Sequence, residues 1–178
     1  RDKWPLGRGF ERFYGFLGGE TDQYHPDLVH DNHQVEPPRT PEQGYHFSED
    51  MIDHSISFLK DLRATYERKP FLLYVAPGAC HAPHQAPASF IEPYRGRFDA
   101  GWDRWREEVY ARQIASGLLP KGTELSERPS WVPSWESLSG DERRLFARMM
   151  EVYAGFMTHT DAQIGRLVDF IEQLGELD

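Results

Sequence analysis

Residues 68–87 read RKPFLLYVAPGACHAPHQAP and contain an unbroken apolar run, residues 71–76, that lacks helical spacing. Pro70 precedes this run, and Pro77-Gly78 follows it. A short apolar run between such breaking residues is typical of a strand that is buried on both faces. Because an amphipathic segment of helical length precedes the run, we predict a helix that leads into an inner strand of a parallel sheet, and therefore an α/β fold.

Two histidines follow the predicted strand directly. His81 and His84 lie on a loop that is stiffened by proline and glycine. Ligands of parallel α/β sheets bind just beyond the carboxyl ends of the strands. The histidines could therefore be metal ligands or include an acid–base group, whereas the plain alternative is that they cap backbone groups. Cys80 could be a nucleophile with His81 beside it, but sequence neighbours on an extended loop point opposite ways, which favours an inert packed thiol.

Apolar residues at helical spacing predict four helices, two of which have clear boundaries. One begins at Ser48 and ends before Pro70, directly ahead of the predicted strand. Another begins at a capping-box pattern, Ser139 to Glu142, and runs to Gly175, a length of about 50 Å at about 1.5 Å per residue. The remaining predictions are helices at 89–94 and 101–116 and irregular segments at 1–24, 25–46 and 118–138.

The composition excludes several classes of protein. The chain has 178 residues, of which 39% are hydrophobic and 13% aromatic, and this argues against general disorder. Its formal net charge of -9 argues against nucleic acid or an anionic membrane surface as the partner. No apolar run approaches the roughly 20 residues that span a bilayer, and a single cysteine excludes an internal disulfide framework. Since one convincing strand cannot make a sheet, we expect an internal piece of a larger α/β protein.

Three other groups of residues could carry chemistry, and each has a plain structural alternative. The first group comprises potential zinc or iron ligands: His25, Asp27, His30, Asp31 and His33. Their spacing fits no familiar metal signature, which favours a solvated polar loop. Lys3, in a glycine-flanked loop, could reach an anionic ligand or be an ordinary surface lysine. The tryptophans of residues 102–135 could form an aromatic lid over a substrate or pack under a long connection.

Several motifs, in the same order along the chain, resemble those of the type I sulfatases. Lys3-Trp4-x-Leu6-Gly7 is similar to Gly-Lys-Trp-His-Leu-Gly of that family, and residues 9–16 resemble the Gly-Phe-(Asp/Glu)-x-Phe-Tyr-Gly-Phe that follows it. Residues 18–24, 74–84 and 149–156 resemble further segments of the bacterial arylsulfatases. The resemblance covers essentially the whole chain, and its motifs are specific in combination.

The resemblance implies an alkaline-phosphatase-like α/β sandwich with a mostly parallel sheet, of which residues 1–178 would be an internal part of a single catalytic domain. It implies hydrolysis of small-molecule sulfate esters with calcium and a formylglycine nucleophile, which is made from the Cys or Ser of a Cys/Ser-x-Pro-x-Arg sequence. By resemblance, Lys3 would contact the sulfate and the leaving-group oxygen, and His81 would bind the sulfate and assist departure. Both roles suit the negative charge that builds on the ester oxygen as the bond breaks.

The sequence also departs from the family pattern. Pro5 replaces the histidine expected after Trp4, and Asp2 replaces the glycine before Lys3. No Cys or Ser is followed by x-Pro-x-Arg, and the aspartates expected of the calcium site are missing. We therefore expect the nucleophile and the metal ligands to lie outside residues 1–178, and the chain alone to be inactive.

The sequence leaves two alternatives to a working sulfatase. A phosphodiesterase or phosphonate hydrolase of the same superfamily would differ in its nucleophile and in its preferred leaving groups. A non-catalytic remnant would fold without turning over any ester. The expected compartment is the bacterial cytoplasm or periplasm.

Overall fold

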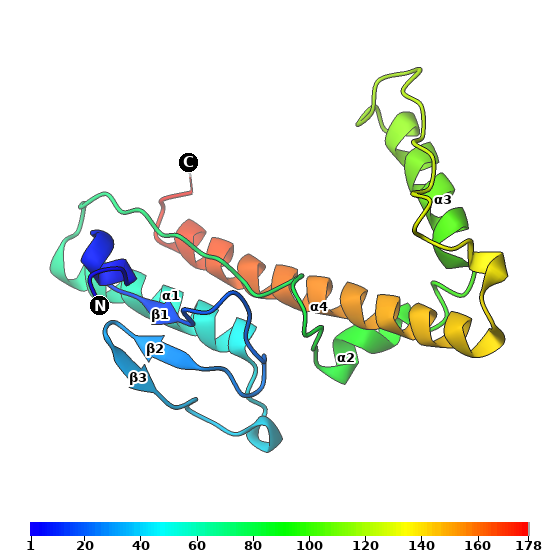
Figure 1. The fold of residues 1–178 in the computed structure, drawn as a ribbon. Coiled ribbons are helices and arrows are strands. Elements are labelled where there is room, and N and C mark those ends of the chain that lie inside the picture. The colour runs from blue at the N-terminus through cyan, green and yellow to red at the C-terminus, as the bar shows by residue number, and fades with distance from the viewer. Residues whose placement is uncertain (178) are drawn as a thin grey trace.

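The computed structural model describes residues 1–177, whose elements are arranged along one long helix, α4 (Gly140–Gln173) (Figure 1). α4 has 34 residues and begins at the N-cap Ser139. The Ser139 hydroxyl accepts a hydrogen bond from the Glu142 N–H, and the Glu142 carboxylate accepts one from the Ser139 N–H. This is the predicted capping box, and it satisfies backbone donors that a helix start leaves unpaired.

A second long helix, α1 (Phe47–Thr65), packs along the C-terminal half of α4 (Figure 1). The predicted helix is confirmed, although its N-cap is His46 rather than Ser48: His46 Nδ1 accepts a hydrogen bond from the Ser48 N–H. The main core lies between α1, α4 and a small sheet, and its buried members are Leu28, Tyr45, Phe47, Met51, Ile52, Leu59 and Leu167.

The sheet has three short antiparallel strands in the order β1 (Tyr14–Gly15), β2 (Leu28–His30) and β3 (His33–Val35). A two-residue turn joins β2 to β3, and its first residue, Asp31, has a φ of 55°. A short polar side chain tolerates this left-handed conformation, which the twist of a tight hairpin requires. The prediction that residues 25–46 lack regular structure is therefore wrong, because strands of three residues are too short to show a period of two.

Residues 71–76, the extended segment, do not form the predicted inner strand. The segment pairs with no strand within residues 1–177. Leu73 and Val75 pack on the main core, whereas Leu72 and Tyr74 are 82% and 76% exposed. The side chains alternate as in a strand, but a backbone ladder needs a neighbouring strand, and the described sheet is antiparallel and lies elsewhere (Figure 1).

Two short helical segments also pack on α4. α2 (Ala88–Ile91) continues into a 3-10 turn, η3 (Glu92–Tyr94), and both pack on α4, which confirms the helix predicted at 89–94. The other 3-10 helices are η1 (Pro5–Arg8), η2 (Pro41–Gln43) and η4 (Trp135–Ser137). Within the described part of the chain, no helix combines the length and apolar character that a bilayer crossing requires.

α3 (Gly101–Ala115), predicted at 101–116, projects away from α4, and residues 116–134 return beside it (Figure 1). We call residues 101–134 the arm. At its base the rings of Trp102 and Trp135 meet edge to face, with centroids 4.8 Å apart. Gly101 has a φ of +80°, and a Cβ there would overlap the Trp135 ring. These two tryptophans therefore pack under the connection, as the plain interpretation predicted.

Candidate functional site

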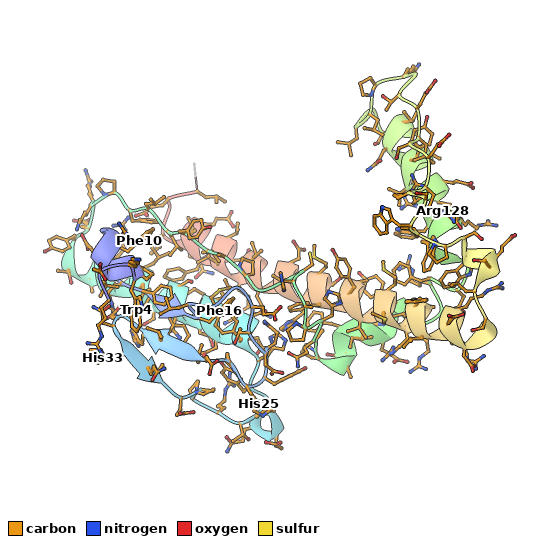
Figure 2. The ribbon with its side chains drawn as sticks, viewed as in Figure 1. Trp4, Phe10, Phe16, His25, His33 and Arg128 are labelled. Atoms are coloured by element: carbon orange, nitrogen blue, oxygen red, sulfur yellow. The ribbon has the colours of Figure 1, made fainter. Side chains whose placement is uncertain are left out.

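A cavity of about 200 Å³ lies where residues 16–23, the first wall, approach residues 76–82, the second wall. Phe16, on the first wall, lies near the middle of the molecule (Figure 2). The lining residues are Phe16, Gly19, Glu20, Thr21, Gln23, Ala76, Pro77, Gly78, His81 and Ala82. The second wall begins at the carboxyl end of the extended segment, which is where the sequence predicted a ligand site.

His81 brings an ionisable ring to this cavity. Its Nδ1 lies 2.8 Å from the Ala82 carbonyl oxygen and 3.2 Å from Glu20 Oε2. Because both neighbours accept hydrogen bonds, Nδ1 carries the hydrogen of the neutral ring, and Nε2 is the nitrogen that gains or releases a proton. His81 can therefore bind an anion or exchange a proton with a ligand in the cavity.

Lys3, the other predicted site residue, is exposed in the turn that precedes η1. It is not among the residues that line the cavity. Its neighbour Trp4 lies near one end of α1, away from Phe16 (Figure 2). The structure therefore does not place the two predicted residues in one cavity, and their joint action stays a prediction.

A polar bridge, which no sequence pattern predicts, joins the first wall to Gln85, three residues after the second wall. The Gln85 side chain accepts a hydrogen bond from the Gln23 N–H and donates one to Asp22 Oδ2, both at 2.7 Å. Burial opposes the charged form of Asp22, but hydrogen bonds from Gln85 and from the Tyr24 and His25 N–H groups outweigh it and lower the pKa of Asp22. We call Gln85, Asp22 and Gln23 the Gln85 bridge.

Two buried histidines lie next to Gln85, whose carbonyl oxygen is 3.3 Å from His46 Nε2. The rings of His46 and His159 meet edge to face with centroids 4.4 Å apart, and the two side chains are 1% and 0% exposed. Burial, reinforced by His159, lowers the pKa of His46 to about 4. His159 Nε2 lies 3.1 Å from Glu49 Oε1, yet burial outweighs this contact and lowers the pKa of His159. Both rings are therefore neutral near neutral pH.

A second buried cluster attaches β1 to α1. The Asp50 carboxylate, only 3% exposed, accepts hydrogen bonds from the hydroxyls of Tyr14 and Tyr45 and lies 3.2 Å from His54 Nδ1. Burial opposes the charge on His54, but its hydrogen bonds to Asp50 raise the pKa of His54. Both tyrosine hydroxyls and His54 Nδ1 face the Asp50 carboxylate, so the cluster is structural.

The predicted metal-ligand group of residues 25–33 does not converge. His25 pairs with Asp22, and the ring of His30 lies against those of Tyr14 and His54. His33 is exposed on β3, and Figure 2 shows it well away from His25. Across residues 1–177, no three His, Cys, Asp or Glu side chains lie together as a metal site would require.

The other two candidates near the cavity face α4. The ring of His84 meets that of Tyr153 edge to face, with centroids 5.2 Å apart. Cys80, half-buried, contacts Met157 Sδ. Both residues therefore attach the second wall to α4, and the thiol is packed as the sequence predicted.

Comparison with known proteins finds sulfatases as relatives of this chain. The Sulfatase family model matches residues 1–178. An uncharacterised sulfatase of Schizosaccharomyces pombe is 30% identical over 99% of this chain and 34% of its own length. An arylsulfatase of Klebsiella aerogenes is 28% identical over 97% of this chain and 40% of its own length. The chain thus spans between a third and two fifths of the length of these relatives.

The fold also has a counterpart among solved structures. A crystal structure of Ps i-CgsB matches 98% of this chain and 31% of its own chain, with a TM-score of 0.57 and 18% sequence identity. The match confirms the fold class predicted from the sequence, a part of an alkaline-phosphatase-like α/β sandwich. The sheet within residues 1–177 is antiparallel, so the predicted mostly parallel sheet is not contained in the described residues.

Proposed function

Since the chain belongs to the sulfatase family, we propose that the whole protein hydrolyses small-molecule sulfate esters. The observation that carries this proposal is His81, which lines a cavity at the carboxyl end of the extended segment with its Nδ1 hydrogen bonded to the Ala82 carbonyl oxygen. Loss of a sulfate ester's leaving group leaves negative charge on the ester oxygen. A protonated imidazole at that oxygen would stabilise the charge and supply the proton.

Glu20 suits this role of His81. Its carboxylate lies 3.2 Å from Nδ1 and orients the ring from the cavity wall. Lys3 is the second residue of the proposal, as a cation for the sulfate and the leaving-group oxygen. Lys3 does not line the cavity with His81, so its part in the proposal rests on the family resemblance.

The nucleophile and the metal of the proposal come from outside this chain. We propose a formylglycine, as the family resemblance implies, and a calcium ion that orients the sulfate. No cluster of carboxylates in residues 1–177 fits such an ion. The chemistry argued for this chain is therefore confined to binding the ester and to protonating its leaving group.

An apolar surface supports the proposal that residues 1–178 are an internal part of one catalytic domain. α4 exposes several large apolar side chains: Leu145, Met149, Met157, Ile164 and Val168. The extended segment adds Leu72 and Tyr74, and its backbone offers unpaired hydrogen-bonding groups. Several large apolar side chains exposed on one helix and an unpaired extended segment are typical of a surface that packs against another part of a protein.

Replacement of His81 in the whole protein tests the proposed function. We expect His81→Asn to lower kcat for aryl sulfates by about 10²- to 10⁴-fold, because general acid catalysis is lost. The loss should grow as the pKa of the leaving phenol rises, since poor leaving groups need the proton most. His33→Asn, an exposed histidine on β3, is the matched control and should leave kcat unchanged.

Two results would contradict the proposed function. A whole protein that cleaves phosphodiesters but leaves aryl sulfates intact would be the alternative hydrolase of the same superfamily. A folded whole protein without turnover of any ester would be the non-catalytic remnant. Peptide mass spectrometry of the whole protein would then find no formylglycine.

A further inference from the structure

We propose that Gln85 is a positioning residue for the cavity: it follows the wall that carries His81 by three residues, and its side chain holds the wall that carries Glu20 through two hydrogen bonds. Gln85 does not line the cavity itself. The inference deepens the proposed function and rests on it, since the ring that Gln85 positions is the proposed proton donor.

The Gln85 bridge uses both ends of one carboxamide. Its Oε1 accepts from the Gln23 N–H and its Nε2 donates to Asp22 Oδ2, each at 2.7 Å. Asp22 Oδ1 in turn accepts from the Tyr24 and His25 N–H groups, at 2.8 Å each. Donors and acceptors are therefore matched in only one arrangement, and this arrangement specifies how the first wall sits against Gln85.

Gln85 is attached firmly on its own side. Its carbonyl oxygen accepts a hydrogen bond from His46 Nε2 at 3.3 Å, at the N-cap of α1. The next residue, Ala86, is buried against Ile91 and Phe156. Because its backbone is held in this way, the Gln85 side chain can keep the first wall in place. A mobile side chain would instead move together with the first wall.

The two walls also touch directly, so a change at the Gln85 bridge would reach His81. A Cβ at Gly78 would lie only 2.6 Å from Gln23 Nε2, which shows how closely the second wall covers the Gln23 side chain. Gln23 is 2% exposed, and its carbonyl oxygen accepts from the Phe47 N–H at 2.8 Å. Movement of the first wall would therefore alter the 3.2 Å contact between Glu20 and His81.

Exchange of one donor for one acceptor tests this inference in the whole protein. Gln85→Glu places a carboxylate against Asp22, which is repulsive. Asp22→Asn keeps an oxygen for the Tyr24 and His25 N–H groups but turns an NH₂ group toward the NH₂ group of Gln85. The double variant Gln85→Glu/Asp22→Asn pairs the new NH₂ group with the new carboxylate, and it keeps the acceptor for the Gln23 N–H. The net charge of the double variant equals that of the parent.

We expect each single variant to lower kcat/KM for aryl sulfates by about 10²-fold, because small misplacements of a catalytic group have effects of this size. The loss should appear mainly in kcat and should grow with the pKa of the leaving phenol. The double variant should recover to within about tenfold of the parent. Gln34→Glu, which changes an exposed glutamine on β3 in the same way, is the control and should match the parent.

Three results would overturn the inference: a single variant within about threefold of the parent, a double variant no better than the weaker single variant, or an equal loss for all leaving groups. The last result would mean only a smaller folded fraction. If a single variant does not fold, the double variant still tests the inference, because the inference requires that it folds and hydrolyses aryl sulfates. A parent that cleaves no sulfate ester would instead contradict the proposed function. The melting temperatures of the parent, the two single variants and the double variant would then show whether the Gln85 bridge exists.

Discussion

Both ring nitrogens of His46 have hydrogen-bond partners only when the ring is neutral. Nδ1 accepts from the Ser48 N–H at 3.2 Å, and Nε2 donates to the Gln85 carbonyl oxygen at 3.3 Å. A proton on Nδ1 would face an N–H donor, next to the buried ring of His159. The hydrogen bond to the Gln85 carbonyl oxygen and the charge of Asp22 favour protonation, but burial outweighs both and lowers the pKa of His46.

This geometry predicts a loss of stability in mild acid. The pKa of His46 is about 4 in the folded protein and 6.5 without its surroundings, so the unfolded chain binds the proton first. The contribution of His46 to the free energy of unfolding is therefore fully present above about pH 6.5 and is lost as the pH drops toward 4. The loss for His46 is about 3 kcal/mol at most. His159, whose pKa is also lowered, acts in the same direction, and His54, whose pKa is raised, partly opposes it.

Urea unfolding of the whole protein at about pH 7 and about pH 4.5 measures this effect. His46→Gln should be less stable than the parent near pH 7, yet it should lose less stability between the two pH values. A parent with equal unfolding free energy at both values would show that His46 is accessible to protons in the folded state.

At the scale of elements, we expect a glycine-to-alanine substitution to have opposite effects on stability at two positions of α4. A Cβ at Gly155 would lie 2.9 Å from the Ile91 Cα, a backbone atom of α2 that cannot turn aside. Gly155→Ala should therefore destabilise the protein by about 1–3 kcal/mol, as overpacked contacts do. A Cβ at Gly165 would face open space, so Gly165→Ala should stabilise the helix by about 0.5–1 kcal/mol.

Denaturant unfolding of the two alanine variants checks this pair. Each variant is the control for the other, because both carry the same change in the same helix. Effects of the same sign would mean that α2 does not pack closely on α4 at Gly155.

At the scale of the whole molecule, the arm joins the rest of the protein through its aromatic base. Trp135 is 7% exposed, its ring meets that of Trp102, and its backbone N–H donates to Asp103 Oδ2 at 2.9 Å. Trp135→Ala should remove this support, at a local cost of about 3–5 kcal/mol. The main core between α1 and α4 lies apart from the arm (Figure 1) and should keep its stability.

Limited proteolysis measures the effect on the arm. We expect faster cleavage within residues 116–134 of the Trp135→Ala variant, because the free energy of local opening of the arm becomes smaller. Trp131→Ala is the control, since the Trp131 side chain is 83% exposed and supports little. Equal cleavage of both variants and the parent would show that the aromatic base does not hold the arm.

The sequence by itself determined the helices. α1, α3 and α4 follow from apolar residues at helical spacing, and the start of α4 follows from its capping box, since caps and periods act over a few residues. It also indicated His81, which follows a recognisable apolar run. The sequence could not determine the strands, because β2 and β3 are too short for a period and the extended segment depends on partners far along the chain.

Only the tertiary structure decided what surrounds His81. Glu20 lies 61 positions before His81, and the Gln85 bridge joins residues 62 and 63 positions apart. Lys3 does not line the cavity that contains His81, and the joint role that the family resemblance implies for the two residues stays a prediction. Local backbone preferences carry no information on such distant pairs, because these contacts form only when α1 and α4 pack and bring the two walls together.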